Sequence, residues 1–526
     1  MMMLMACVAV LRSTSGNIGL HGFALFGFAL TLVPSIQYSL NLIEWSGTVW
    51  VSSAYLLGFS LLVALGAQWE RVAPNQLADG LFFAIGLAAL ISVGMQIYQW
   101  LGLEHLDIWV ISAASRRPAA NLGQPNDLGT LLICGLLSIA WCKRRYRIST
   151  GVALFAAFYL IFGIVLTKSR TAWIALFLLA LSGWLWRDLL ESRRRLWVAF
   201  ALALCFVASF FVTDYIEGKL SNFSPEDTPD ILRVQGELRP TIWMMFVDAA
   251  LQNPLWGYGW NQLAAAQLSI ATNHPTVGVV VAHSHNLFLD LVLWVGIPLG
   301  AMATMYIAVW LWSSIRAVRT YESIILLLMI VVILNHAMLE LPLHHAYFLF
   351  PVALVIGSIN IRLGRSAIVY VSKYFLVLFV VLATAIFVLV SRDYLRIEAS
   401  YQELRYEWAG IKTETPPKPP EVVLLNHLAE YINFARINPS HNMSEQMLDT
   451  MRKVATEYPN TGVVYKYATA LVLNHRVDEA KLWVERLCKV VPASNCDAVK
   501  QGLTRRGLID SEFSRVDWLS LGNENR

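Results

Sequence analysis

Apolar runs long enough to cross a bilayer recur along this 526-residue chain, and they constrain its fold more than any other feature. A helix needs about 20 mostly apolar residues to span the hydrocarbon core, and somewhat fewer where the bilayer thins. The runs that meet this requirement are 18–37, 48–67, 77–101, 127–142, 151–167, 170–187, 196–213, 285–312, 322–340, 346–360 and 370–391. Residues 1–11 are apolar but too short to span, and we interpret them as an extension or part of a helix rather than a removed signal peptide. The prediction is an all-α, polytopic membrane protein with about 11–12 transmembrane helices.

The composition supports this class. Hydrophobic residues make up 57% of the chain and charged residues only 14%, whereas soluble domains have about a quarter charged. The nineteen Trp and nineteen Tyr suit the aromatic belts at membrane interfaces. The net charge of +4 comes from short basic clusters between apolar runs, which indicate topology. We therefore expect the lipid bilayer as a partner and no nucleic acid.

Four basic clusters predict the orientation. They are 143–147, 187–195, 316–319 and 362–365. With alternate crossings all four lie on one side, which the positive-inside rule assigns to the cytoplasm. The opposite, external side then receives the long 214–284 loop and everything after about residue 392. The N-terminus is expected inside and the C-terminus outside.

The last part of the chain has a different composition, so we divide it into domains 1–391 (transmembrane, with an external loop at about 214–284) and 392–526 (soluble and helical). A Pro-rich stretch at 413–420 precedes helical patterns, and 465–487 resembles a tetratricopeptide-type helix hairpin. No Cys/His spacing typical of a metal site occurs. Cys488 and Cys496 either form a disulfide in an oxidising compartment or remain two free thiols.

Two arginines fall on the external side, away from the basic clusters. Arg170 begins a membrane helix, where the helix dipole disfavours a cation, and Arg239 lies in the large loop. The planar guanidinium binds phosphate through two donors at once. Each arginine is interpreted either as a phosphate ligand or as an interfacial anchor or surface ion pair.

Two histidines stand where the long loop meets the next membrane helix. His285, followed by Asn286, has an imidazole suited to accept a proton from a hydroxyl group, and His283 points to another face if the helix has begun. The alternative is a pair of water-facing interfacial histidines. Asp290 is a polar anomaly in an apolar run, and it pairs with Asn286 or orients a neighbouring group.

Two further polar islands lie on the same side. Glu340, His344 and Tyr347 belong to the turn between two spans, and Gln124 and Asn126 belong to a Gly/Pro/Asn-rich loop. These side chains either line the same cavity as the histidines or cap the helices beside them.

The order of these motifs resembles a known family. Gln124-Pro125-Asn126 is followed by Ser169-Arg170-Thr171, Arg239 to Trp243, Asn253 to Gly259, His283 to Asn286 and Glu340-Leu341-Pro342. Residues 20–390 resemble the bacterial O-antigen ligase superfamily. The Gln-Pro-Asn and Glu-Leu-Pro islands favour its protein O-oligosaccharyltransferases, which glycosylate pilins and other exported proteins.

The resemblance implies a reaction and its partners. An oligosaccharide would pass from undecaprenyl pyrophosphate to a Ser or Thr hydroxyl of a pilin-like acceptor, at the periplasmic face of a bacterial inner membrane. No cofactor, nucleotide or metal is expected. His285 would be the base, and Arg170 and Arg239 would hold the pyrophosphate. This chain has Trp294 where the family often has an acid, so Asp290 or Glu340 must substitute for it or acceptor preference differs.

Other functions remain open at this point. A lipid A core acceptor would make the chain an O-antigen ligase, and a glycan acceptor would make it a polymerase of carrier-linked glycan. A transporter of lipid-linked sugar is disfavoured, because the chain has no paired halves and its polar anomalies lie at one membrane face.

Overall fold

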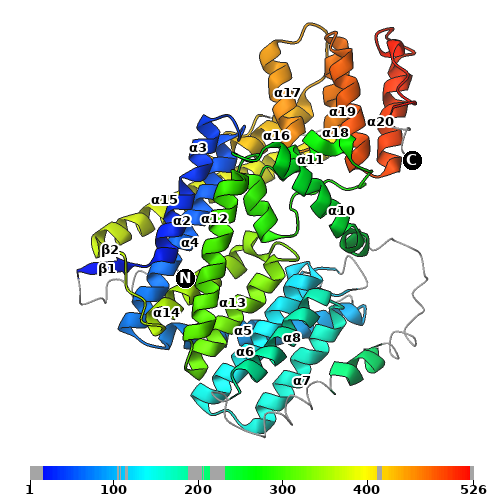
Figure 1. Ribbon diagram of the computed structural model, residues 1–526. Coiled ribbons are helices and arrows are strands. Elements are labelled where there is room, and N and C mark those ends of the chain that lie inside the picture. The colour runs from blue at the N-terminus through cyan, green and yellow to red at the C-terminus, as the bar shows by residue number, and fades with distance from the viewer. Residues whose placement is uncertain are drawn as a thin grey trace.

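The computed structural model of the chain describes residues 16–103, 106, 108–112, 117–187, 204, 206–213, 231–411 and 418–521. These residues form an apolar helical body below and a group of shorter helices above it (Figure 1). The predicted all-α class is confirmed. The N-terminal run 1–11, the basic residues 193–195, half of the run 196–213 and most of the Pro-rich stretch lie outside the described residues.

The apolar body supports a multi-pass membrane protein. Among the described residues, six helical segments are long and apolar enough to cross a membrane, and four shorter apolar helices accompany them. The long ones are α2 (Gly22–Thr31) with α3 (Val33–Ser39), α4 (Ser46–Val72), α5 (Gln76–Trp100), α6 (Pro125–Tyr146), α12 (Leu287–Ala317) and α15 (Lys373–Trp408). The shorter ones are α7 (Thr150–Leu166), α8 (Arg170–Leu185), α13 (Tyr321–Ala337) and α14 (Ala346–Arg362).

Two predicted spans begin later than expected. Strands β1 (Asn17–Leu20) and β2 (Val369–Ser372) pair antiparallel, with Asn17 opposite Ser372, so neither segment is helical. The strand pair satisfies backbone groups that a helix would have satisfied. The helical starts predicted at residues 18 and 370 are therefore wrong by a few residues.

Basic residues and the polar islands lie at opposite ends of the same helices. Helix α6 begins beside Asn126 and ends in Lys143, Arg144 and Arg145. Helix α14 likewise begins after His345 and ends at Arg362. This separation agrees with the use of the basic clusters as markers of one membrane side.

Helices α4 and α14 pack backbone against backbone. A side chain at Gly66 would collide with the Leu354 carbonyl, and one at Gly357 would collide with the Val63 carbonyl. Small residues permit such close contact between membrane helices. The pair fixes α14, and with it the turn that precedes α14.

Helix α12 is broken at Gly296, which has φ +82° and is followed by Pro298. The freed carbonyls are satisfied by the segment 253–259: Tyr258 N–H donates to Leu293 O at 2.8 Å and Gly259 N–H to Trp294 O at 3.2 Å. A non-helical backbone inside a membrane helix is tolerated where neighbouring protein satisfies it in this way. The loop segment therefore holds the first turns of α12.

The long loop carries α10 (Ile231–Gln252), α11 (Leu263–Ile270) and the 3₁₀ turn η2 (Ala271–Asn273). Three more 3₁₀ turns complete the fold: η1 (Ala120–Leu122), η3 (Pro342–His344) and η4 (Phe513–Arg515). The C-terminal helices are α16 (Asn426–Arg436), α17 (Glu445–Glu457), α18 (Thr461–Leu473), α19 (Val477–Val490) and α20 (Ala493–Arg506).

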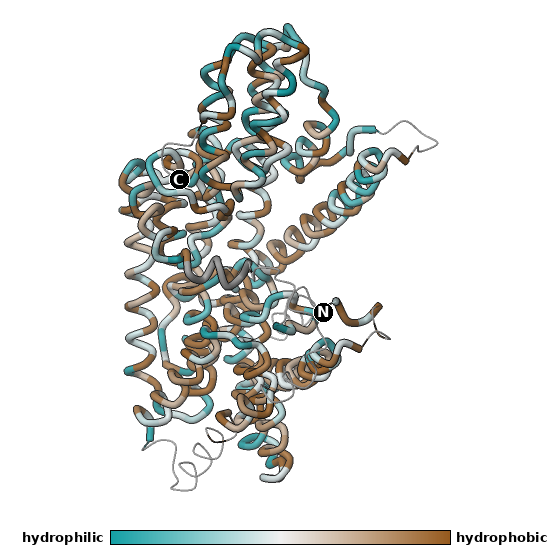
Figure 2. The backbone as a smooth tube through the Cα atoms, turned by 90° about the vertical axis from the view of Figure 1, so that its right-hand side faces the viewer, coloured by the Kyte–Doolittle hydropathy of each residue, from teal (hydrophilic) through white to brown (hydrophobic). Residues whose placement is uncertain are grey.

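The C-terminal helices have a core of their own, which includes Tyr467 and Trp483 and extends to Trp45, Leu268 and Ala271 of the body. Polar and apolar residues alternate on these helices, whereas the body is mostly apolar (Figure 2). Helix α15 continues from the body to Trp408, so the predicted division at 391/392 falls within one helix. Cys488 and Cys496 form a disulfide between α19 and α20.

Candidate functional site

His285 lies at the end of a loop that three hydrogen-bonding groups hold. The buried Gln267 side chain donates to Val279 O at 2.9 Å and accepts from Val281 N–H at 2.8 Å. The Trp243 indole donates to Ser284 O at 2.7 Å, and Val277 N–H donates to Lys489 O at 2.9 Å. Helices α10 and α11 of the long loop and the C-terminal helix α19 thus determine where the loop ends.

The backbone of His285 has φ +58°, a left-handed conformation that is uncommon outside glycine. Such a residue costs about 1–3 kcal/mol, and strained residues of this kind cluster at functional sites. The next residue starts helix α12, because the Asn286 side chain accepts from Phe288 N–H at 3.0 Å and Leu289 N–H at 3.3 Å. Asn286 is therefore a helix cap, and the strained residue before it carries the imidazole.

Glu340 connects His285 with Arg239. Its Oε2 lies 2.9 Å from His285 Nδ1, and its Oε1 pairs with the Arg239 guanidinium. The Glu340 side chain is only 6% exposed. Burial raises the pKa of Glu340, but the hydrogen bond from His285 and the charges of His285 and Arg239 outweigh it, so the net pKa lies below the ordinary value. Glu340 is therefore an ionised carboxylate, and it accepts a hydrogen bond from the N–H at Nδ1 of His285.

Asn126 extends this network towards Arg170. Its amide donates to Glu340 Oε1 at 3.1 Å, and its carbonyl oxygen accepts from Ser169 Oγ at 2.7 Å. Ser169 also caps α8 by accepting from Ala172 N–H. Arg170 directly follows this cap and is exposed, and no carboxylate within the described part of the chain pairs with it. Gln124 precedes α6 and gives its first turn no side-chain hydrogen bond.

A second buried carboxylate, Asp127, organises the other polar residues and was not singled out by sequence reasoning. It accepts from Tyr347 Oη at 2.9 Å, and His345 and His336 lie 3.5 and 3.6 Å from it. Asp127 adjoins Asn126 at the start of α6, so the Asn-Asp dipeptide was the signal available. These contacts attach the start of α14 to α6 and make Tyr347 a structural neighbour of the site.

Asp290 does not contact Asn286 through its side chain; instead, it accepts from Ser284 N–H at 2.8 Å. It thereby orients the residue before His285, which is one of the two roles expected for it. Trp294, at the position where the resemblance implies an acid, is buried against Trp260, with ring centroids 4.8 Å apart. Of the two expected substitutes, Glu340 is the carboxylate that contacts His285.

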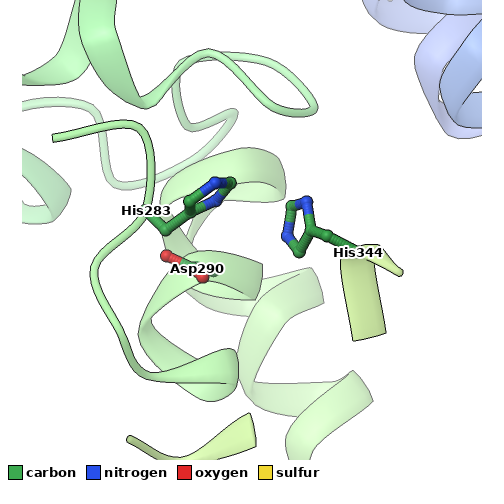
Figure 3. A group of neighbouring side chains, drawn as sticks. All are labelled: His283, Asp290 and His344. Atoms are coloured by element: carbon green, nitrogen blue, oxygen red, sulfur yellow. The ribbon is translucent and has the colours of Figure 1, made fainter. Parts of the chain in front are cut away.

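His283 and His344 meet beside this pair, with ring centroids 4.3 Å apart. Burial and nearby histidines lower the pKa of His283 to about 3 and that of His344 to about 4. Both imidazoles are therefore neutral near pH 7. Asp290 lies next to them, as Figure 3 shows.

The site thus brings together most of the residues singled out in the sequence. His285, Arg239, Asn126 and Glu340 form one hydrogen-bonded group, and His283, Asp290 and His344 form a second beside it. The first group offers a base oriented by a carboxylate and a cation beside it. Gln267, Trp243 and Asp127 hold the elements in place; Asp127 adjoins Asn126 and Trp243 ends a motif of the resemblance, whereas no spacing in the sequence distinguished Gln267.

Comparisons with known proteins add to this geometry. Residues 155–304 match the family model described as O-antigen ligase, and residues 324–505 match the one described as virulence factor membrane-bound polymerase, C-terminal. The chain is 30% identical over 474 residues to a general O-oligosaccharyltransferase of Acinetobacter baylyi, covering 87% of this chain and 81% of that protein. It is 29% identical over 362 residues to a ComP-specific O-oligosaccharyltransferase of the same organism, covering 68% and 65%.

Proposed function

The chain belongs to the O-oligosaccharyltransferases of the O-antigen ligase family, which are glycosyltransferases, and from that premise we propose its donor, acceptor and residue roles. The enzyme transfers a whole oligosaccharide from undecaprenyl pyrophosphate to Ser or Thr hydroxyls of a pilin-like protein. The observation that carries this proposal is the 2.9 Å contact between His285 Nδ1 and Glu340 Oε2.

That contact specifies how His285 acts. A carboxylate is an acceptor only, so Nδ1 carries the proton and Nε2 is left free to accept one. The acceptor hydroxyl gives its proton to Nε2 as its oxygen bonds to the anomeric carbon of the sugar. As this bond forms, the bond between the anomeric carbon and the pyrophosphate oxygen breaks. Undecaprenyl pyrophosphate leaves with the electron pair of the broken bond. The negative charge of Glu340 stabilises the imidazolium that forms.

The two arginines act on the departing pyrophosphate. Arg239 contacts Glu340 through one nitrogen, and a guanidinium has five N–H donors, so donors remain for a phosphate oxygen. Arg170 stands exposed at the start of α8, one residue from the Ser169–Asn126 hydrogen bond. Cations beside the leaving group offset the negative charge that it gains, and this stabilisation is largest where water is excluded from the site.

The basic helix ends support the proposed location. By the positive-inside rule, the ends of α6, α12 and α14 that carry Arg and Lys belong to the cytoplasm, which supports a site and C-terminal helices that face the periplasm of a bacterial inner membrane. The disulfide in the C-terminal helices agrees with an oxidising compartment. These helices stand directly beside the loop that carries His285, where they offer a surface for the acceptor protein.

The test is co-expression of the chain with a lipid-linked glycan pathway and a candidate pilin, followed by intact-mass measurement of the pilin. We expect a glycan-sized mass increase with the wild type, and none with His285→Ala or Arg239→Ala at equal membrane expression. His441→Ala and Arg405→Ala are matched controls, because both side chains are 54% exposed and lie in the C-terminal part of the chain. Modified pilin with His285→Ala overturns the role of the base.

The fate of the glycan separates the alternative acceptors. Glycan on the pilin supports the proposal. Glycan attached to lipid A core with unmodified pilin indicates an O-antigen ligase, and a lengthened carrier-linked glycan indicates a polymerase. Either of those two results overturns protein transfer.

A further inference from the structure

His283, Asp290 and His344 form a group of potential metal ligands beside the catalytic pair (Figure 3). One ligand atom from each residue lies within 4.8 Å of the others. The three residues come from separate places: the loop before α12, the first turn of α12 and the 3₁₀ turn η3. Among the described residues, this is the one group of three or more such side chains that converges in this way.

Hydrogen bonding within the protein accounts for only part of the group, because Asp290 Oδ1 accepts from Ser284 N–H at 2.8 Å whereas His283 lacks such a partner on one nitrogen. His283 Nδ1 is buried without a hydrogen-bond partner. A buried polar atom without a partner costs about 1–3 kcal/mol, and an imidazole nitrogen is an atom that a metal ion can satisfy.

The chemistry of the three side chains identifies the class of ion that they would bind. Two neutral imidazoles and one carboxylate suit first-row divalent ions, and three protein ligands with an open fourth position are typical of zinc sites that also hold a water molecule. Tetrahedral zinc with ligands at about 2.0–2.1 Å places ligand atoms about 3.4 Å apart. The ligand atoms lie within 4.8 Å of one another, so binding requires them to move closer together.

We propose that His283, Asp290 and His344 bind one Zn²⁺ ion, which clamps the loop carrying His285 to the turn carrying Glu340. His283 is two residues from His285, and His344 is four residues from Glu340. An ion bound to both segments fixes the separation of these two catalytic elements. The ion is a positioning element, and no bond of the glycan transfer forms or breaks on it. The proposal stands independently of the transfer reaction.

The first test measures zinc directly. Full-length protein with a histidine-free tag is purified in detergent from zinc-supplemented cells, and metal is quantified by mass spectrometry. We expect about one zinc ion per chain for the wild type and for His441→Ala, and a loss of about tenfold or more for His344→Ala and Asp290→Asn. Less than a tenth of that amount in the wild type, or equal zinc in the wild type and His344→Ala, overturns the site.

A second variant separates loss of the ion from loss of the fold. His344→Cys replaces the imidazole by another zinc ligand, so it should retain the ion that His344→Ala loses. Chelation should lower the Tm of the wild type and of His344→Cys but leave that of His344→Ala unchanged, since only a bound ion stabilises the folded state. An equal shift in all three proteins contradicts a specific site.

Discussion

His285 Nδ1 and Glu340 Oε2 lie 2.9 Å apart, although 54 residues separate them in the chain and each belongs to a different loop. Glu340 reaches this position because α13 ends three residues earlier, and His285 reaches it because Asn286 starts α12. The same carboxylate pairs with Arg239, so one side chain aligns the proposed base and one proposed phosphate ligand. Glu340 is therefore the residue whose replacement best tests the site.

Glu340→Gln is expected to lower kcat for glycan transfer by about 10²–10⁴-fold. The amide can present N–H groups to Nδ1, which favours the tautomer with the proton on Nε2 and removes the base. The measurement is the transfer rate of purified protein with a lipid-linked donor and an acceptor peptide.

Two further variants serve as controls for the effect of Glu340→Gln on the transfer rate. Glu340→Asp keeps a carboxylate and should recover part of the rate, whereas the exposed Glu398→Gln should leave it unchanged. A wild-type rate for Glu340→Gln would remove Glu340 from the mechanism.

Gln267→Leu is expected to lower kcat with little change in KM for the lipid donor. The substitution preserves volume but leaves Val279 O and Val281 N–H without their partner, at about 1–3 kcal/mol each. The loop that leads to His285 is then no longer held in place, while the two arginines proposed to bind the donor are unchanged. The exposed Gln402→Leu on α15 is the matched control. An unchanged kcat together with a lowered Tm would show that Gln267 serves stability alone.

The membrane helices could be predicted because the bilayer imposes a length and a composition on each of them. The polar islands could be assigned to one membrane side because the basic residues mark the other. Both predictions depend on local sequence. The strand pair β1–β2 could not be predicted, because its partners are separated by most of the chain and neither pairs with a near neighbour.

The site was predictable as a list of residues but not as a set of contacts. Loop closure determines that Glu340 rather than Asp290 contacts His285, and no spacing in the sequence reports it. The contact of Asn286, in contrast, follows from local sequence, since an Asn at the start of an apolar run is the ordinary signal for a helix cap. The disulfide between Cys488 and Cys496 was one of two open alternatives, and the close packing of α19 with α20 decides it.

Glu457→Gln is expected to stabilise the protein increasingly as pH rises. Burial raises the pKa of Glu457, which lies against α4 with its Oε1 3.4 Å from Thr48 Oγ1. A raised folded-state pKa means that the carboxyl group favours folding below the unfolded value of about 4.5 and that this contribution is lost as pH rises through the folded value. The Tm of the variant should match that of the wild type at pH 4 and exceed it at about pH 8. The opposite trend would contradict the buried-acid interpretation.

Arg170 allows the phosphate role to be separated from the role of a membrane anchor. Arg170→Lys keeps the charge but loses the planar fork, so KM for the lipid-linked donor should rise, and Arg170→Ala should raise it further, by about tenfold or more in total. The acceptor KM should stay constant, because the proposed contact of the guanidinium is with the lipid-linked donor. Arg405→Lys and Arg405→Ala on the exposed part of α15 provide the matched pair.

A membrane anchor at Arg170 predicts a different result. Lys would then replace Arg without loss of activity, and Ala would lower the amount of inserted protein while KM is unchanged. Steady-state kinetics on the purified variants, normalised to folded protein, therefore decide between the two roles.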